Sequence, residues 1–320
     1  MRLTVLESND AARNLACEDA LLSSGGERFL LWRNSPSVII GRHQNAHAEA
    51  DAEYAKINGI KIVRRLSGGG AVYHDLGNIN FSVIKKYDKN ETDPGDEPGS
   101  VLFFLRGLGI PAEAKGRNDF VANGKKISGT ARTVRDGRLL CHGTILFDAD
   151  LNAMERVLTV SGAKYESRGV ASIRGRVANL REFLPDMTAE GFWERIVEYY
   201  SRIYDSKPIT EAETVNAEKL QVERYESWDW NFGASPKYSY EKTMRTDAGT
   251  LTVYARVDKG IIEEIKICGD FFSFGGVEEI ERALVGAKRE AEELGRILLT
   301  LPIGEIIINL NAQQLLSALV

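Results

Sequence analysis

Three consecutive glycines behind two arginines form the part of this sequence best suited to bind an anion. The segment Arg64–His74 reads RRLSGGGAVYH. Glycines let the backbone approach a ligand and turn its N–H groups inward, and arginines pair with phosphate or carboxylate groups. A glycine-rich turn beside solvated arginines has the same composition, so both interpretations stay open. Neither G-x-x-x-x-G-K-[ST] nor G-x-G-x-x-G occurs, which excludes a Walker P-loop and a Rossmann site.

Two adjacent lysines follow a turn-forming Asn-Gly dipeptide in a second segment, Gly116–Gly129. Asn-Gly favours a tight hairpin between neighbouring antiparallel strands. Side chains alternate along a strand, so one of Lys125 and Lys126 should face the core side of the sheet. A lysine buried there needs an anion to compensate its charge. Two lysines at an exposed edge are the commoner arrangement for a hairpin.

A cysteine and a histidine are adjacent in a third segment, Cys141–Phe147. A Cys–His pair is one form of nucleophilic site, but neighbours in a strand point to opposite faces and cannot exchange a proton. We therefore expect Cys141 to be inert packing. His43 and His47 lie four residues apart, but no second ligand pair follows at zinc spacing.

Apolar periodicity predicts the elements that position these segments. Strands are expected at residues 2–6, 29–32, 38–40, 60–66, 78–84, 120–122, 126–133, 144–147, 250–257 and 261–268. Helices are expected after a cap at Asn9 or Asp10 and at residues 51–58, 101–108, 187–203, 277–294 and 311–319. Residues 88–98 have the composition of a mobile loop, and residues 228–237 that of a boundary. We expect two domains, a large mixed α/β domain at 1–240 and a small β-β-α domain at 241–320.

The overall composition is that of an ordinary folded protein. The 320 residues are 43% hydrophobic and 27% charged, with a net charge of −5; this excludes a disordered chain, a coiled-coil rod and a disulfide scaffold. The charge balance predicts neither nucleic acid nor a membrane surface as a partner. Charged residues interrupt every candidate membrane span, and the N-terminus turns polar too early for a signal peptide. Three widely spaced cysteines suit a reducing compartment, so we expect a cytoplasmic protein.

The three segments together resemble the motifs of the lipoate–protein ligase A family. Arg64–Asn78 is similar to the family's signature loop, and Gly116–Gly129 to the motif that holds its essential lysine. Further similar blocks are Leu31–Asn34, Ile40–Asn45, His142–Thr144, Ser172–Leu180 and Trp228–Gly233. The resemblance runs nearly from end to end.

This resemblance implies an α+β fold. Its catalytic domain would be of the biotin/lipoyl protein ligase type, a mixed sheet with helices like that of class II aminoacyl-tRNA synthetases, followed by a small α+β C-terminal domain. It also implies a two-step reaction. Lipoate attacks the α-phosphate of ATP to give lipoyl-AMP and pyrophosphate, and the lipoyl group then passes to a lysine of an acceptor protein. The implied acceptors are lipoyl domains of 2-oxoacid dehydrogenase E2 subunits and the glycine-cleavage H protein, and we expect a monomer.

The resemblance further implies roles for individual residues. Lys126 bridges the lipoate carboxylate and the α-phosphate, and Asp119 contacts Mg²⁺ beside phosphate oxygens. The implied ATP and adenylate site comprises Arg65, Gly70, Ala71, Val72, Tyr73, Asn118, Asp119 and Lys126. The implied lipoate site comprises Trp32, Arg65, Ser67, Gly70, His74, Lys126, His142, Gly143 and Thr144.

Several alternatives stay open on the sequence. Cys141 permits a cysteine-dependent octanoyl or lipoyl transferase on the same fold, although such transferases generally lack the residues after 240. A lipoyltransferase that uses preformed lipoyl-AMP, a protein that binds lipoate without catalysis, and a preference for octanoate are also compatible. A biotin ligase is disfavoured, because its Gly-Arg-Gly-Arg loop is missing. Residues 232–236 are a candidate hinge for movement of the C-terminal domain.

Overall fold

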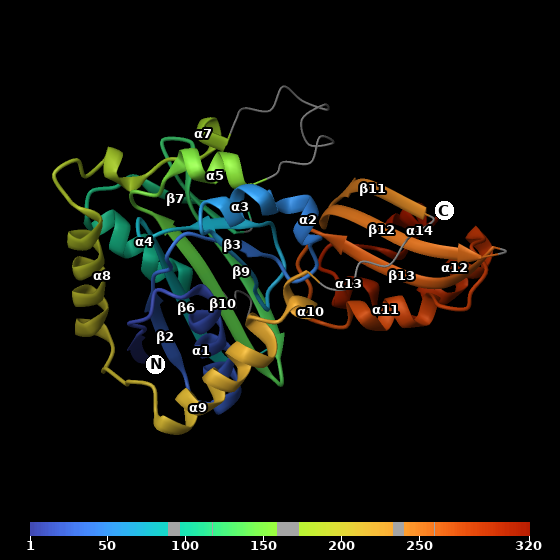
Figure 1. Cartoon of the computed structure of the whole chain (residues 1–320), viewed down its shortest axis with the longest axis horizontal. Helices are drawn as coiled ribbons and strands as arrows, with labels where there is room; N and C mark the ends of the chain where they lie inside the picture. Colours follow the sequence, from blue (N-terminus) through green and yellow to red (C-terminus); the bar gives the residue numbers. More distant parts are fainter. Residues whose placement is uncertain (89–96, 117, 159–172, 233–239, 259) are drawn as a thin grey trace.

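In the computed structural model, the described residues are 1–88, 97–116, 118–158, 173–232, 240–258 and 260–320. They form a large lobe built on two sheets, and a smaller C-terminal lobe at the right of Figure 1. The expected loop at 88–98, the boundary segment at 228–237, the hinge at 232–236 and the turn before residue 261 fall partly outside these residues.

A seven-stranded sheet forms the centre of the large lobe, in the order β1-β2-β6-β10-β9-β8-β7. Its strands are β1 (Arg2–Val5), β2 (Arg28–Trp32), β6 (Asn78–Lys86), β7 (Ala112–Lys115), β8 (Asp119–Ala122), β9 (Lys125–Arg135) and β10 (Arg138–Leu146). Only β1 and β2 pair in parallel among these neighbours; the other pairs are antiparallel. The sheet is therefore a mixed one, as the family resemblance implies.

Helices cover both faces of this sheet, because alternate side chains of its strands are apolar. On one face, Phe29, Phe81 and Cys141 pack with helices α4 (Glu97–Gly107) and α8 (Ala189–Ile203). On the other face, Leu30, Trp32 and Leu140 pack with helices α1 (Ala11–Ser24) and α9 (Glu211–Leu220). Asp10 caps α1 by accepting from the backbone N–H of Arg13, which confirms one of the two expected caps.

A second sheet of three strands lies over the α1 side of the large one. Its order is β4-β3-β5, from β3 (Ser37–Ile40), β4 (Lys61–Arg64) and β5 (Val72–His74). Ile39 and Val63 of this sheet share the core of α1. Helices α2 (Ala46–Glu49), α3 (Ala52–Ile57) and α5 (Leu151–Val157) pack beside it, with the short elements α7 (Ile173–Arg176), η1 (Leu180–Glu182), η2 (Gln221–Tyr225) and α10 (Trp228–Asn231) completing the lobe. The glycine loop, residues 65–71, joins β4 to β5 between the two sheets.

The C-terminal lobe has its own apolar core around a three-stranded antiparallel sheet. The strands are β11 (Tyr240–Thr246), β12 (Gly249–Asp258) and β13 (Ile261–Gly269), and the helices are α11 (Val277–Leu284), α12 (Ala291–Leu299), α13 (Ile303–Ile306) and α14 (Ala312–Leu319). Their colours run from orange to red in Figure 1.

Two expectations for this lobe are wrong. The expected helix at 277–294 is two helices, because the chain leaves α11 at Val285 and Gly286 takes a φ of +87°. The expected β-β-α arrangement omits strand β11, which pairs with β12. The side chains of β11 are largely polar or charged and exposed, so the strand gives no hydrophobic pattern from which it could be predicted. Elsewhere the strand expected at 144–147 begins at Arg138.

Candidate active site

The glycine loop lies above the α1 face of the large sheet and forms a cavity of about 160 Å³ with it. Because β10 alternates, His142 and Thr144 face this cavity while Cys141 faces the opposite core. Eight of the nine residues predicted for lipoate line the cavity: Trp32, Arg65, Gly70, His74, Lys126, His142, Gly143 and Thr144. Leu15 and Ile39 add apolar lining that the motifs did not indicate.

A second cavity, of about 570 Å³, lies on the other side of Lys126. Tyr73 and Asp119, two of the residues predicted for ATP, line this second cavity only. The two cavities share part of their lining, namely Gly70, Ala71, Val72, Lys126 and Thr144. Lys126 therefore stands in the wall shared by the first cavity and the larger second one.

A β-bulge and a glycine determine where the Lys126 side chain lies. Opposite the step from Phe120 to Val121 in β8, strand β9 contains one extra residue, which changes the alternation after Lys126. The ammonium of Lys126 lies 2.7 Å from a carboxylate oxygen of Asp119. The side chain crosses Gly129, where an added Cβ would lie 2.7 Å from the Lys126 nitrogen. Lys126 is 37% exposed, so this is not the buried lysine that alternation predicted.

The guanidinium of Arg65 is directed at the glycine loop itself. It donates to the carbonyls of Gly68 at 2.6 Å and Gly70 at 2.9 Å, and to that of Ile39 at 3.0 Å. Burial lowers the pKa of Arg65 to about 10. In this structure Arg65 thus sets the shape of the loop, and its contact with a phosphate stays a prediction.

A buried chain of hydrogen bonds connects α1 to the loop, and the motifs missed its acidic member. The carboxylate of Glu18, 1% exposed, lies 2.9 Å from His142 Nδ1 and accepts from the Ser82 hydroxyl at 2.6 Å. His142 Nε2 lies 2.6 Å from Ser67 Oγ, which accepts from Arg65 Nε at 3.1 Å. Ser67 is therefore covered by this chain rather than exposed in the cavity.

This chain has the residue types of a serine nucleophile site but not its access. The Glu18 carboxylate accepts from His142 Nδ1–H, and Ser67 Oγ accepts from Arg65 and shares a hydrogen bond with His142 Nε2. Ser67 is fully buried. The chain therefore orients His142 and the loop and does not supply a nucleophile.

His74 lines the cavity, and its neutral ring carries one buried donor. The amide of Asn34 accepts from Asn14 through its oxygen, so its nitrogen donates to His74 Nδ1 at 3.1 Å. The proton of the neutral ring then lies on Nε2, a buried atom of a cavity-lining residue. Burial lowers the pKa of His74 to about 3, with Arg65 adding to this effect.

The remaining predicted residues lie close by. Asn118 lines the first cavity, and its carbonyl accepts from the N–H of Thr130 at 2.7 Å. Tyr73 is buried, and burial raises the pKa of its hydroxyl. Cys141 is 3% exposed, belongs to the core cluster that contains Phe81, and lines neither cavity. This position does not support a cysteine nucleophile.

The acidic side chains near the cavities could hold Mg²⁺ only together with oxygens of a bound ligand. Among the described residues, no group of three or more His, Cys, Asp or Glu side chains could hold a metal ion. Mg²⁺ in nucleotide sites takes one or two carboxylates plus phosphate oxygens. The carboxylate of Asp119, in the second cavity beside Lys126, fits that donor set.

Both the fold and these cavities define a class of acyl-group ligases, and comparison with known proteins narrows the class. Residues 10–201 match the lipoyl protein ligase A/B catalytic domain, and residues 235–319 match the bacterial lipoate protein ligase C-terminus. Lipoate-protein ligase LplJ of Bacillus subtilis is 42% identical over 306 residues, which is 91% of this chain and 91% of the relative. This chain belongs to the lipoate–protein ligase family.

Two solved structures resemble about three quarters of this chain. One is a bi-partite lipoate protein ligase from Thermoplasma acidophilum, described with its E2 lipoyl domain, at a TM-score of 0.65 and 33% identity; it covers 75% of this chain and 98% of that chain. The other is a lipoate-protein ligase A bound with ATP, at a TM-score of 0.62 and 32% identity over 72% of this chain and 98% of that chain. No helix among the described residues is long and apolar enough to cross a membrane.

Proposed function

We propose that this chain is an ATP-dependent lipoate–protein ligase that activates lipoate as lipoyl-AMP and transfers the lipoyl group to a lysine of an acceptor protein. The position of Lys126 between the two cavities carries the proposal. Family membership, the lipoate ligase names of the relatives and a relative bound with ATP support it.

The first step joins two anions, and Lys126 reduces their repulsion. A carboxylate oxygen of lipoate attacks the α-phosphorus of ATP, a P–O bond forms, and the bond to the β-phosphate oxygen breaks to release pyrophosphate. The Lys126 ammonium, placed at the shared wall, neutralises charge on both reactants. Asp119 holds this ammonium in place at 2.7 Å.

The two cavities receive different parts of the adenylate in this proposal. The acyl chain lies in the first cavity, along Trp32 and His74, with Gly143 and Thr144 of β10 in its wall. The adenosine part lies in the second cavity beside Gly70–Tyr73. Asn118 and Arg65 border the phosphate, and Asp119 would contact Mg²⁺, whose bound charge offsets that of the phosphates.

The second step needs only an amine within reach of the carbonyl carbon. The acceptor lysine attacks it, an amide bond forms, AMP leaves with the bonding electrons, and the amine loses its proton. A relative described together with its E2 lipoyl domain supports such a domain as acceptor. The H protein as a second acceptor, a monomeric state and a cytoplasmic location are further parts of the proposal.

We further propose residues 1–240 as the catalytic domain and 241–320 as an accessory domain. The separate apolar core of the C-terminal lobe supports this division.

Transfer to an acceptor tests the function as a whole. An unmodified lipoyl domain is incubated with the protein, lipoate and Mg-ATP, and its intact mass is measured. We expect the mass of one lipoyl group to be added to the domain, by wild type and by Cys141→Ser alike. Modification with lipoyl-AMP but not with lipoate and ATP would instead identify a lipoyltransferase, and an acyl mass on Cys141 would identify a thioester mechanism.

A further inference from the structure

Backbone contacts join the C-terminal lobe to the catalytic lobe beside the glycine loop. The segment concerned is 269–274, which begins at the last residue of β13. The N–H of Gly269 donates to the carbonyl of His43 at 2.9 Å, and the N–H of Gly69 donates to the carbonyl of Phe271 at 3.1 Å. One N–H of the glycine loop is therefore used to bind the other lobe.

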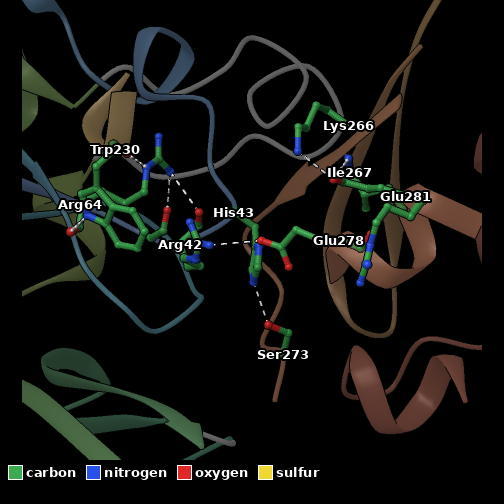
Figure 2. A network of polar contacts seen from close by, with 11 residues as sticks. Arg42, His43, Arg64, Trp230, Lys266, Ile267, Ser273, Glu278 and Glu281 are labelled. Carbon is green, nitrogen blue, oxygen red and sulfur yellow. Dashed lines mark hydrogen bonds and ion pairs between the residues drawn. The ribbon is translucent and has the colours of Figure 1, made fainter. Parts of the chain in front are cut away.

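Side chains reinforce this junction (Figure 2). His43 Nε2 lies 2.7 Å from Ser273 Oγ, and Arg42 pairs with Glu278 at 3.1 Å. The His43 ring stacks on Phe271 at a centroid distance of 5.0 Å. Burial lowers the pKa of His43 to about 4, so this ring is neutral near pH 7. A neutral, stacked and hydrogen-bonded histidine fixes the segment in one position.

Two glycines of the loop make this close approach possible. A Cβ added to Gly68 would lie 2.3 Å from the carbonyl oxygen of Phe271, a distance that real side chains do not tolerate. A Cβ on Gly69, whose φ is +89°, would lie 3.1 Å from the ring of Phe272. The glycines thus serve the junction between the lobes as well as the cavity below them.

The junction brings one aromatic ring of the C-terminal lobe into the wall of the first cavity. Phe272 lines that cavity, and every other described residue that lines it precedes residue 145. Its carbonyl accepts from the N–H of Ile308 at 3.0 Å, which anchors it to its own lobe. The ring therefore occupies the wall only while the lobe is seated.

We propose that Phe272 is a specificity-determining residue of the acyl site. In the seated position its ring closes part of the cavity that receives the acyl chain, so the C-terminal lobe contributes to the choice of carboxylic acid. This inference rests on the proposed ligase function, because it assumes that the first cavity holds the acyl group.

Truncation of the ring tests this proposal. Phe272→Ala should weaken lipoate binding about tenfold, the ratio that corresponds to about 1.4 kcal/mol. Calorimetric titration of the full chain with lipoate, without ATP, measures this directly. In lipoate-dependent pyrophosphate release, KM should rise for lipoate with little change in KM for ATP. The ratio of kcat/KM for decanoate to that for octanoate should rise, because the wall is opened.

Phe274→Ala is the matched control, since its half-buried ring belongs to the same segment but contacts Tyr87, with centroids 6.0 Å apart, and does not line the cavity. Phe272→Leu, which keeps an apolar wall, should lie between wild type and Phe272→Ala. Lipoate binding and acid preference in Phe272→Ala that equal those of wild type would overturn the proposal. The absence of lipoate-dependent pyrophosphate release by wild type would instead overturn the ligase function. The calorimetric comparison would still test whether Phe272 contributes to lipoate binding.

Discussion

At the scale of the residue, the position of the Lys126 ammonium depends on Gly129, which has no side chain to displace it. We predict that Gly129→Ala displaces the ammonium, because the new Cβ would lie 2.7 Å from it. A misplacement of about 1 Å can cost about 100-fold in rate, so kcat for lipoate-dependent pyrophosphate release should fall by about that factor. Gly107→Ala is the control, since nothing lies within 4 Å of a Cβ there. Equal activity of the two variants would show that Lys126 is not held as described.

The buried ring of His74 leads to a prediction about how folding stability depends on pH. Its folded pKa is about 3, below the ordinary value of 6.5, because the ring is buried. As the pH drops from 6.5 towards 3, the His74 ring binds a proton in the unfolded chain but not in the folded chain. The stability of the fold therefore decreases over this range. The loss is about 1.4 kcal/mol per pH unit. Urea unfolding at pH 7 and pH 5 should show a smaller loss for His74→Gln than for wild type; parallel losses would contradict the assignment.

At the scale of the element, helix α1 supports the glycine loop through Glu18. We predict that Glu18→Ala destabilises the protein by about 1–3 kcal/mol, the cost of leaving buried polar partners unpaired. His142 and Ser82 would both lose their acceptor. The free energy of unfolding in urea measures the effect, and Glu7→Ala, at an exposed position before α1, is the control. A loss no larger than that of Glu7→Ala would remove Glu18 from a supporting role.

The elements also show how far the sequence predicts this molecule. The motifs predicted the glycine loop and the lysine hairpin, because both depend on short, local residue patterns. They missed Glu18, since its partners come from distant strands and only the packed fold brings them together. Periodicity joined α11 to α12 because the apolar pattern continues past Gly286, where the backbone breaks the helix. Arg65 was predicted to contact phosphate. Its hydrogen bonds to carbonyls of the glycine loop form only in the folded loop and could not be predicted from the motif.

At the scale of the whole molecule, two lobes with separate cores meet at the glycine loop. The large lobe supplies the lysine and nearly all of the described lining of both cavities, and the C-terminal lobe supplies one wall residue. Among the described residues, the junction includes several hydrogen bonds, the ring contacts His43–Phe271 and Tyr87–Phe274, and one half-exposed ion pair. The half-exposed ion pair contributes about 1 kcal/mol or less to this junction, so the buried contacts around His43 and Phe271 contribute most of it.

The most direct test of the account is lipoate-dependent release of pyrophosphate from Mg-ATP without any acceptor protein, compared between Lys126→Ala and Lys125→Ala. These neighbours differ in position, since Lys126 lies between the two cavities and Lys125 lines neither. The account predicts that Lys126→Ala abolishes release and that Lys125→Ala retains it. Release by Lys126→Ala at the wild-type rate would contradict the central role given to this lysine.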